Sequence, residues 1–222
     1  MEKISLTTKD NKSISGNFFP AENARGWVIY LHMMPSAKES WNRIAGRLAR
    51  DGYSGLAIDL RGHGESEGGP NGYKYFSDAE HQASINDVEA AFDFLLSKGA
   101  RAGHIRLIGA SIGANLAIEF FSKHKEFPSA VFLSAGTNYR GVSALRAAEN
   151  LSPGQSALFL TSRDDLGADG SNPEQNEAII SSLPSGVKAE KVIYNSAGHG
   201  TNILQTKEDP DPEELIVSFI ER

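Results

Sequence analysis

The sequence of 222 residues contains no cysteine. This absence excludes disulfides, thiolate nucleophiles and cysteine-ligated metal or iron–sulfur sites. Long apolar runs are absent too, and none approaches the roughly 20 residues that a membrane span requires. The opening residues, MEKISLTTKD, lack the apolar core of a signal peptide. A cytoplasmic location is therefore the default expectation, and an exported protein with its leader removed would look the same.

Positive charge is also scarce. The chain has 22 Lys and Arg against 28 Asp and Glu, a formal net charge of −6. The basic residues are scattered, which argues against nucleic acid or an anionic membrane surface as a partner. The length suits one substantial core and is short for two. We therefore expect a single domain over residues 1–222, and the sequence leaves the oligomeric state open.

The chain contains a regular alternation of strand-like apolar runs and amphipathic helical stretches. Residues 3–8 and 13–19 flank a polar turn and predict a hairpin. The apolar run from Trp27 to Leu31 is typical of a strand buried on both faces. Further strands are predicted at 53–58, 104–108, 129–134, 156–161 and 188–194, and helices at 38–50, 78–98, 112–124, 141–149, 173–182 and after Asp211-Pro212.

This alternation predicts an α/β protein with a mostly parallel sheet of about eight strands and helices on both faces. The hairpin would add antiparallel strands at one edge. In the first turn of the helix 173–182, Asn172 is expected to be the cap. Only about twenty residues separate the strands 129–134 and 156–161, which leaves little room for an inserted lid domain, so we expect none.

One serine stands between two glycines where a predicted strand gives way to a helix, in Gly109-Ala110-Ser111-Ile112-Gly113. To attack a carbonyl, a hydroxyl needs a neighbouring base and must stand clear of its own backbone. A tight strand-to-helix turn meets the second need, and glycines let strand and helix pack closely around it. The pattern predicts that Ser111 is a nucleophile, with a plain glycine-rich turn as the alternative.

With a buried strand before it and a helix after it, this motif resembles the nucleophile elbow of the α/β hydrolases. The resemblance covers essentially the whole chain and implies the three-layer α/β-hydrolase fold, with no cofactor. A second stretch, DLRGHGES from Asp59 to Ser66, is similar to a loop common in these hydrolases. There we expect Asp59 and Arg61 to tie a tight glycine turn and His63 to be a turn residue.

The order of residues in that family places an acid and then a histidine after the serine. Of the two later histidines, His124 lies in a polar helix end, where a solvated or dipole-facing role is expected. His199, in SAGHG after the last strand, resembles the general base. The resemblance implies that Asp165 orients His199, with Asp164 as the alternative acid. The other aspartate would cap the loop through backbone N–H groups.

An oxyanion hole needs two backbone donors, and the N–H of Ile112 is the first. The second is expected in the loop His32-Met33-Met34-Pro35, after the strand 27–31. The family often has His-Gly there, so Met33 departs from its pattern, and residue-by-residue matching implies Met34 as the donor. Met33 and Met34 either pack as ordinary apolar side chains or line a substrate pocket with flexible apolar surface.

These residues predict a serine hydrolase that cleaves small to medium carboxylic esters through an acyl-enzyme. The layout also resembles the dienelactone-hydrolase-like branch, whose namesake nucleophile is a cysteine that this chain lacks. A peptidase or thioesterase of the same fold and a non-catalytic binding module are the alternatives.

No metal or nucleotide site is expected. The carboxylates Asp164, Asp165 and Asp169 are the ligand type of hard cations, but their spacing is not that of an EF-hand. No His-x-x-x-His or Glu-x-x-His pair indicates zinc. No Gly-x-Gly-x-x-Gly follows the first buried strand, so a dinucleotide has no motif either.

Overall fold

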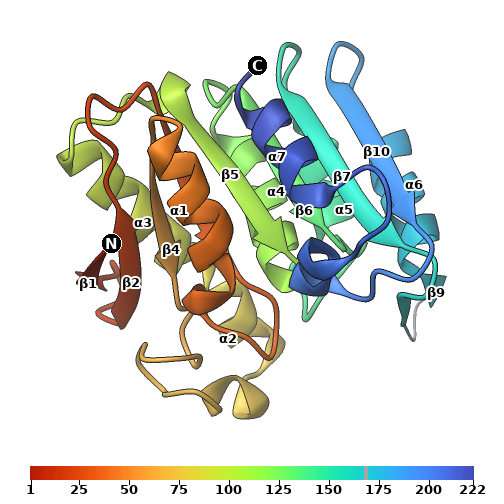
Figure 1. The fold of residues 1–222 in the computed structure, drawn as a ribbon. Helices are drawn as coiled ribbons and strands as arrows, with labels where there is room; N and C mark the ends of the chain where they lie inside the picture. Colours follow the sequence, from red (N-terminus) through yellow and green to blue (C-terminus); the bar gives the residue numbers. More distant parts are fainter. Residues whose placement is uncertain (168–169) are drawn as a thin grey trace.

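The computed structural model describes residues 1–167 and 170–222. Its centre is an eight-stranded sheet of order β1-β2-β4-β3-β5-β6-β7-β10 (Figure 1). The hairpin of β1 and β2 is antiparallel and joins β4 in antiparallel register, whereas the other six strands run parallel. The predicted sheet is therefore confirmed. The strands are β1 (Glu2–Thr7), β2 (Ser13–Phe19), β3 (Gly26–Leu31), β4 (Tyr53–Ile58), β5 (Ile105–Ala110), β6 (Ser129–Leu133), β7 (Ser156–Ser162) and β10 (Lys188–Tyr194), with the small pair β8 (Leu166–Gly167) and β9 (Gly170–Ser171) apart from the sheet.

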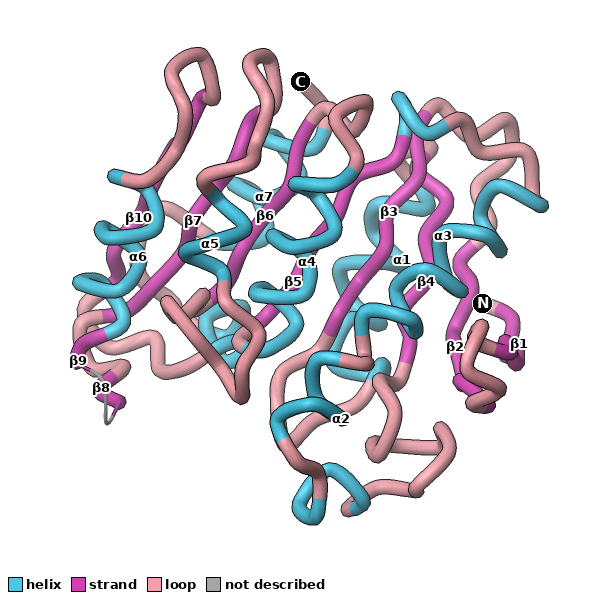
Figure 2. Tube along the Cα trace, turned by 180° about the vertical axis from the view of Figure 1, so that it is seen from behind, coloured by secondary structure: helices cyan, strands magenta, loops and turns pink. Residues whose placement is uncertain are grey.

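Helices cover both faces of the sheet, which gives the three predicted layers. The helices α1 (Asn42–Arg50) and α7 (Pro212–Ile220) lie on one face (Figure 1). The other face carries α3 (Ile85–Ser97), α4 (Ile112–Lys123), α5 (Ala144–Ala148) and α6 (Asn172–Ser181), which are in front in Figure 2. The central strands are buried on both sides because each face packs against its own apolar cluster. No helix in the described part of the chain is long and apolar enough to cross a membrane.

Three of the predicted helices differ from the prediction at an end or in continuity. The expected helix 78–98 is split into α2 (Asp78–Gln82) and α3, because the backbone between them closes tighter turns, such as Asp87 N–H to the Ser84 carbonyl. The first turn of the expected helix 38–50 is a 3₁₀ segment, Lys38–Trp41. Ser171 instead of Asn172 is the N-cap of α6, where it forms a capping box with Glu174.

Asp59 organises the loop that follows β4. Its carboxylate accepts hydrogen bonds from the backbone N–H of Lys38 (2.8 Å), from Lys38 Nζ (2.6 Å) and from the N–H of Glu65 (2.9 Å). The side chains of Lys38 and Asp59 are both fully buried. Burial alone would lower the pKa of Lys38, but its ion pairs with Asp59 and Glu65 raise it. A Cβ at Gly64 would lie 2.2 Å from the Asp59 carboxylate, so this turn requires glycine.

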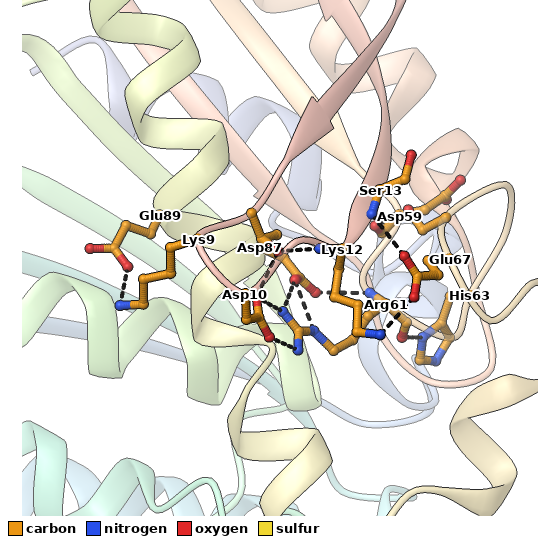
Figure 3. Close-up of polar contacts among 12 residues, drawn as sticks. Lys9, Asp10, Lys12, Ser13, Asp59, Arg61, His63, Glu67, Asp87 and Glu89 are labelled. Atoms are coloured by element: carbon orange, nitrogen blue, oxygen red, sulfur yellow. Dashed lines mark hydrogen bonds and ion pairs between the residues drawn. The ribbon is translucent and has the colours of Figure 1, made fainter.

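Arg61 ties the same loop to two distant segments (Figure 3). Its guanidinium donates to Asp87 on α3 through Nε (2.9 Å) and Nη2 (2.7 Å), and to Asp10 of the β1–β2 turn through Nη1 (2.6 Å). The backbone N–H of Arg61 also donates to Asp87 (2.8 Å). The expectation that Asp59 and Arg61 tie this glycine turn is confirmed.

Replacing Arg61 by methionine should lower the free energy of unfolding by about 3–5 kcal/mol, because it leaves the buried Asp87 carboxylate without its cation. The exposed pair Lys9–Glu89 (2.6 Å) provides the control. Since water screens that pair, Lys9→Met should cost at most about 1 kcal/mol. Urea unfolding followed by circular dichroism measures both losses, and equal losses would contradict a structural role for the Arg61 network.

Candidate active site

Ser111 occupies the turn between the end of β5 and the first residue of α4. Its backbone, at φ 54° and ψ −123°, is in a region that residues other than glycine rarely adopt. The N–H of Ser111 donates to the Leu133 carbonyl of β6 (2.8 Å), and its carbonyl accepts from Ala114 (2.8 Å). The strained turn is therefore held from both the sheet and the helix. Within the described residues the hydroxyl of Ser111 has no hydrogen-bond partner.

The two glycines of the motif permit a close approach of helix and strands. A Cβ at Gly109 would lie 2.3 Å from the carbonyl oxygen of Gly113. A Cβ at Gly113 would lie 2.4 Å from the carbonyl oxygen of Leu31, at the end of β3. Any side chain at either position would push α4 away from the sheet. The close packing expected from the sequence is therefore present.

His199 and Asp165 contact each other directly. Nδ1 of His199 lies 2.9 Å and 2.8 Å from the two carboxylate oxygens of Asp165. The Asp165 side chain is largely buried, whereas that of His199 is 35% exposed. The geometry therefore pairs Asp165 and not Asp164 with the imidazole. A proton on Nδ1 shared with the carboxylate leaves Nε2 as the basic nitrogen.

Asp164 holds the loop in which His199 lies. Its carboxylate accepts hydrogen bonds from the Ser162 hydroxyl and from the N–H of Gly198 (3.1 Å). The Ser162 hydrogen bond, followed by that of Gly198, lowers the pKa of Asp164. The hydroxyl of Ser162 also accepts from the N–H of Ala197 (2.8 Å). Asp164 thus makes the loop-capping contact that was expected of whichever aspartate does not pair with His199.

The loop with His199 is fixed to the same strand end as Ser111. Ser134 directly follows Leu133, the acceptor for Ser111, and its hydroxyl accepts from the N–H of Gly200 (2.8 Å). Gly200 is the residue after His199. No hydrogen bond joins Ser111 to His199 among the described residues. In unliganded sites such bonds are often long and tighten when substrate binds.

The loop after β3 places its two methionines on opposite sides. Met33 packs beside the apolar cluster that includes α7, and a Cβ at Gly200 would meet its sulfur at 2.4 Å. Met34 packs against the other cluster and lines a cavity of about 200 Å³. His32 holds this loop, because its Nε2 accepts from the N–H of Leu60 (3.0 Å). Each methionine therefore has a packing contact, and Met34 also faces a cavity.

The remaining histidines lie in other environments. His63 is buried, its ring stacks on Tyr73 at 4.3 Å, and its Nδ1 lies 3.0 Å from the Arg61 carbonyl. Burial, followed by the charge of His32, lowers the pKa of His63 to about 4, so it is neutral at physiological pH. His124, for which a solvated or dipole-facing role was expected, is the C-cap residue of α4, and its ring also packs against Phe120, Phe127 and Phe92.

A second cavity of about 290 Å³ lies beside His199. Its lining includes residues that the sequence reasoning missed, because they become neighbours only through the packing of α6 and of the turn after β6. The ring of Tyr139 is 6.3 Å from that of His199, edge to face. The lining residues are Tyr139, Asp165, Leu166, Gly167, Asn172, Gln175 and His199.

Three or more potential metal ligands do not gather anywhere in residues 1–167 and 170–222. Of the carboxylates considered for a hard cation, Asp164 and Asp165 are engaged with Gly198 and His199. Asp169 lies outside the described residues.

The strained serine turn after β5, the histidine loop after β10 and the order of the parallel strands define the α/β-hydrolase class. Within this class, the chain belongs to the family described as serine aminopeptidase, S33, whose family model matches residues 22–199.

Individual proteins resemble this chain in sequence or in fold, and the solved structures among them do so at low sequence identity. The "Putative 2-succinyl-6-hydroxy-2,4-cyclohexadiene-1-carboxylate synthase" of Bacillus subtilis is 30% identical over 115 residues, 52% of this chain and 38% of that protein. The chain thus spans well under half the length of this relative. An esterase of Pyrococcus furiosus has a TM-score of 0.77 at 21% identity, covering 100% of this chain and 91% of the other. A dienelactone hydrolase of Anabaena variabilis has a TM-score of 0.71 at 17% identity, covering 98% and 93%.

Two serines at positive φ allow a matched test of strain and hydrogen bonding. Since the Ser111 hydroxyl has no hydrogen-bond partner among the described residues, Ser111→Ala should change the free energy of unfolding by no more than about 0.5 kcal/mol. Ser134→Ala should destabilise by about 1–3 kcal/mol, because it leaves the N–H of Gly200 without its acceptor. Denaturant unfolding of both variants measures these changes in the free energy of unfolding. A large decrease in Ser111→Ala would identify its hydroxyl as a structural hydrogen-bonding group.

Proposed function

We propose that the protein is a serine hydrolase that cleaves carboxylic esters of small to medium size through a covalent acyl-enzyme. The observation that carries this proposal is the His199–Asp165 pair, which is fixed to the strand end that also positions the strained Ser111. Membership of the serine aminopeptidase S33 family supports it. The chemistry requires no cofactor.

Each group has a defined role in the proposed mechanism. Ser111 Oγ attacks the substrate carbonyl while Nε2 of His199 takes its proton. Asp165 keeps the other proton on Nδ1 and stabilises the imidazolium. The backbone N–H groups of Ile112 and Met34 donate hydrogen bonds to the oxyanion. His199 then protonates the leaving alcohol, and water releases the acyl group by the same steps.

We also propose that no lid covers the site. Between β6 and β7 the chain forms only a tight turn at Tyr139–Val142 and the five-residue helix α5. The cavities beside His199 and Met34 are small, about 290 and 200 Å³, which suits compact substrates. A peptidase is the second candidate, because the family is described by a serine aminopeptidase.

The cavity next to Met34 favours an acyl group with negative charge. Its lining includes Lys74 and Arg140, and neither forms an ion pair within the described residues. Arg140 has φ 51°, a strained conformation for a non-glycine residue. Burial, followed by the charge of Arg140, lowers the pKa of the nearby His81. The name of the Bacillus relative also refers to a carboxylate compound. A substrate carboxylate would supply the counter-ion that the two cations lack.

The proposed triad predicts distinct losses for two neighbouring aspartates. Asp165→Asn should lower kcat/KM for p-nitrophenyl butyrate by on the order of 10³-fold or more, because the amide favours the wrong imidazole tautomer. Asp164→Asn should lose less than about tenfold, since the amide oxygen still accepts from Gly198. Ser111→Ala should abolish turnover and labelling by a fluorophosphonate probe, detected by intact mass.

Three results would contradict the proposal. An unlabelled wild-type Ser111 with no turnover would indicate a binding module. Equal losses in Asp164→Asn and Asp165→Asn would remove the assigned acid. Faster cleavage of aminoacyl-anilides or thioesters than of oxygen esters would favour a peptidase or a thioesterase.

Charge selectivity provides a separate test of the acyl pocket. We expect mono-p-nitrophenyl glutarate to have a higher kcat/KM than p-nitrophenyl butyrate in the wild type. Arg140→Gln should lower this ratio by about 5–20-fold, because it removes one charge-assisted contact with the acyl carboxylate. Arg146→Gln, an exposed arginine on α5, should leave the ratio unchanged. An unaltered ratio in Arg140→Gln would show that Arg140 does not contact the acyl group.

A further inference from the structure

A row of polar residues crosses the sheet at the amino ends of four parallel strands. Ser129 on β6 is in register with Ser156 on β7, which is in register with Lys188 on β10. On β5, Leu107 pairs with Ala130, so Arg106 lies at the level of Ser129. This edge is at the top in Figure 1, beside the end of α7. It is opposite to the edge with Ser111, about five residues or roughly 16 Å away along β5.

The row points to one face of the sheet. Ile108, Val131 and Leu158 lie two residues further along the same strands and belong to the apolar cluster that packs against α1 and α7. Because side chains alternate between faces, Arg106, Ser129 and Ser156 must point to this same face. They line a cavity of about 370 Å³, which Phe219 and Arg222 at the end of α7 help to enclose.

Arg106 is a cation without a counter-ion. It forms no ion pair within the described residues, and its Nε is buried without a hydrogen-bond partner. Among the described residues its one side-chain hydrogen bond is a long one from Nη1 to the His104 carbonyl (3.4 Å), and its guanidinium carbon lies 5.3 Å from the centre of the Tyr53 ring. Burial lowers the pKa of Arg106, yet a guanidinium remains charged at neutral pH. The guanidinium has no counter-ion among the described residues, so an anion in the cavity would supply one.

The rest of the lining adds donors and few acceptors. The hydroxyls of Ser129 and Ser156 have no hydrogen-bond partner in the part of the chain that the structure describes, and Lys188 has no ion pair there. Among the described lining residues the one acidic side chain is that of Glu190, and it is paired with Arg222. The cavity is therefore electropositive in a protein whose formal net charge is −6.

We propose that this cavity binds the phosphate group of a small phosphorylated compound. A guanidinium, two hydroxyls and an ammonium come from four different strands, so they suit the several oxygens of a tetrahedral anion. A carboxylate has two oxygens, which Arg106 alone would satisfy. The cavity volume leaves room for the organic part of a phosphate ester. The site does not depend on the proposed hydrolase chemistry at the other edge of the sheet.

Titration calorimetry with inorganic phosphate and with glycerol 3-phosphate tests this proposal, at constant ionic strength set by sodium acetate. We expect saturable binding with Kd of about 1 mM or tighter. Arg106→Gln and the exposed Lys188→Glu should each weaken it about tenfold or more, because each removes a charge that faces the anion. Arg146→Gln, outside the cavity, should bind as the wild type does.

The absence of saturable binding in the wild type would overturn the proposal. Unchanged affinity in both Arg106→Gln and Lys188→Glu would also overturn it, because the anion would then lie elsewhere. Lys188→Glu guards against a folding defect in Arg106→Gln, since the Lys188 side chain is on an exposed edge strand. Thermal melts without phosphate should show that both variants are folded.

Discussion

The start of α4 packs directly against the ends of β3 and β5, and the remaining geometry of the site depends on this contact. Only glycine fits at positions 109 and 113, where carbonyl oxygens lie 2.3 and 2.4 Å from an added Cβ. The chain can enter the helix this abruptly only if the intervening residue adopts a strained backbone conformation. Ser111 is that residue, so the same contact that closes the core also presents its hydroxyl at the edge of the sheet.

Side-chain hydrogen bonds to backbone groups convert this edge into a fixed site. The hydroxyls of Ser134 and Ser162 accept hydrogen bonds from backbone N–H groups on either side of His199. The carboxylate of Asp164 accepts a third hydrogen bond from the same loop. Asp59 and Arg61 anchor the loop after β4 through their bonds to Lys38 and Asp87. Buried polar groups are expensive to leave unpaired, so each such bond favours one loop conformation over its alternatives. The polar row at the opposite edge differs, because Arg106 keeps an unpaired buried donor.

Much of the fold could be predicted from local sequence patterns. Apolar runs identified all eight strands of the sheet, and the motif around Ser111 identified the turn, because burial and glycine chemistry act over a few residues. The errors occurred where a distant partner overrides local preference. The expected helix 78–98 is interrupted at Ser84, the N-cap of α3, and three residues later Asp87 is held by the distant Arg61.

The sequence by itself determined the alternation of strands and helices, the glycine-flanked serine and the short list of candidate bases and acids. Only the tertiary structure decided that His199 contacts Asp165 while Asp164 holds the loop, and that Arg106, Ser129, Ser156 and Lys188 line one cavity. The physical reason is that periodicity and turn chemistry are local properties of the chain. Which side chains meet depends on strand register and loop closure, and these are fixed by contacts between residues far apart in sequence.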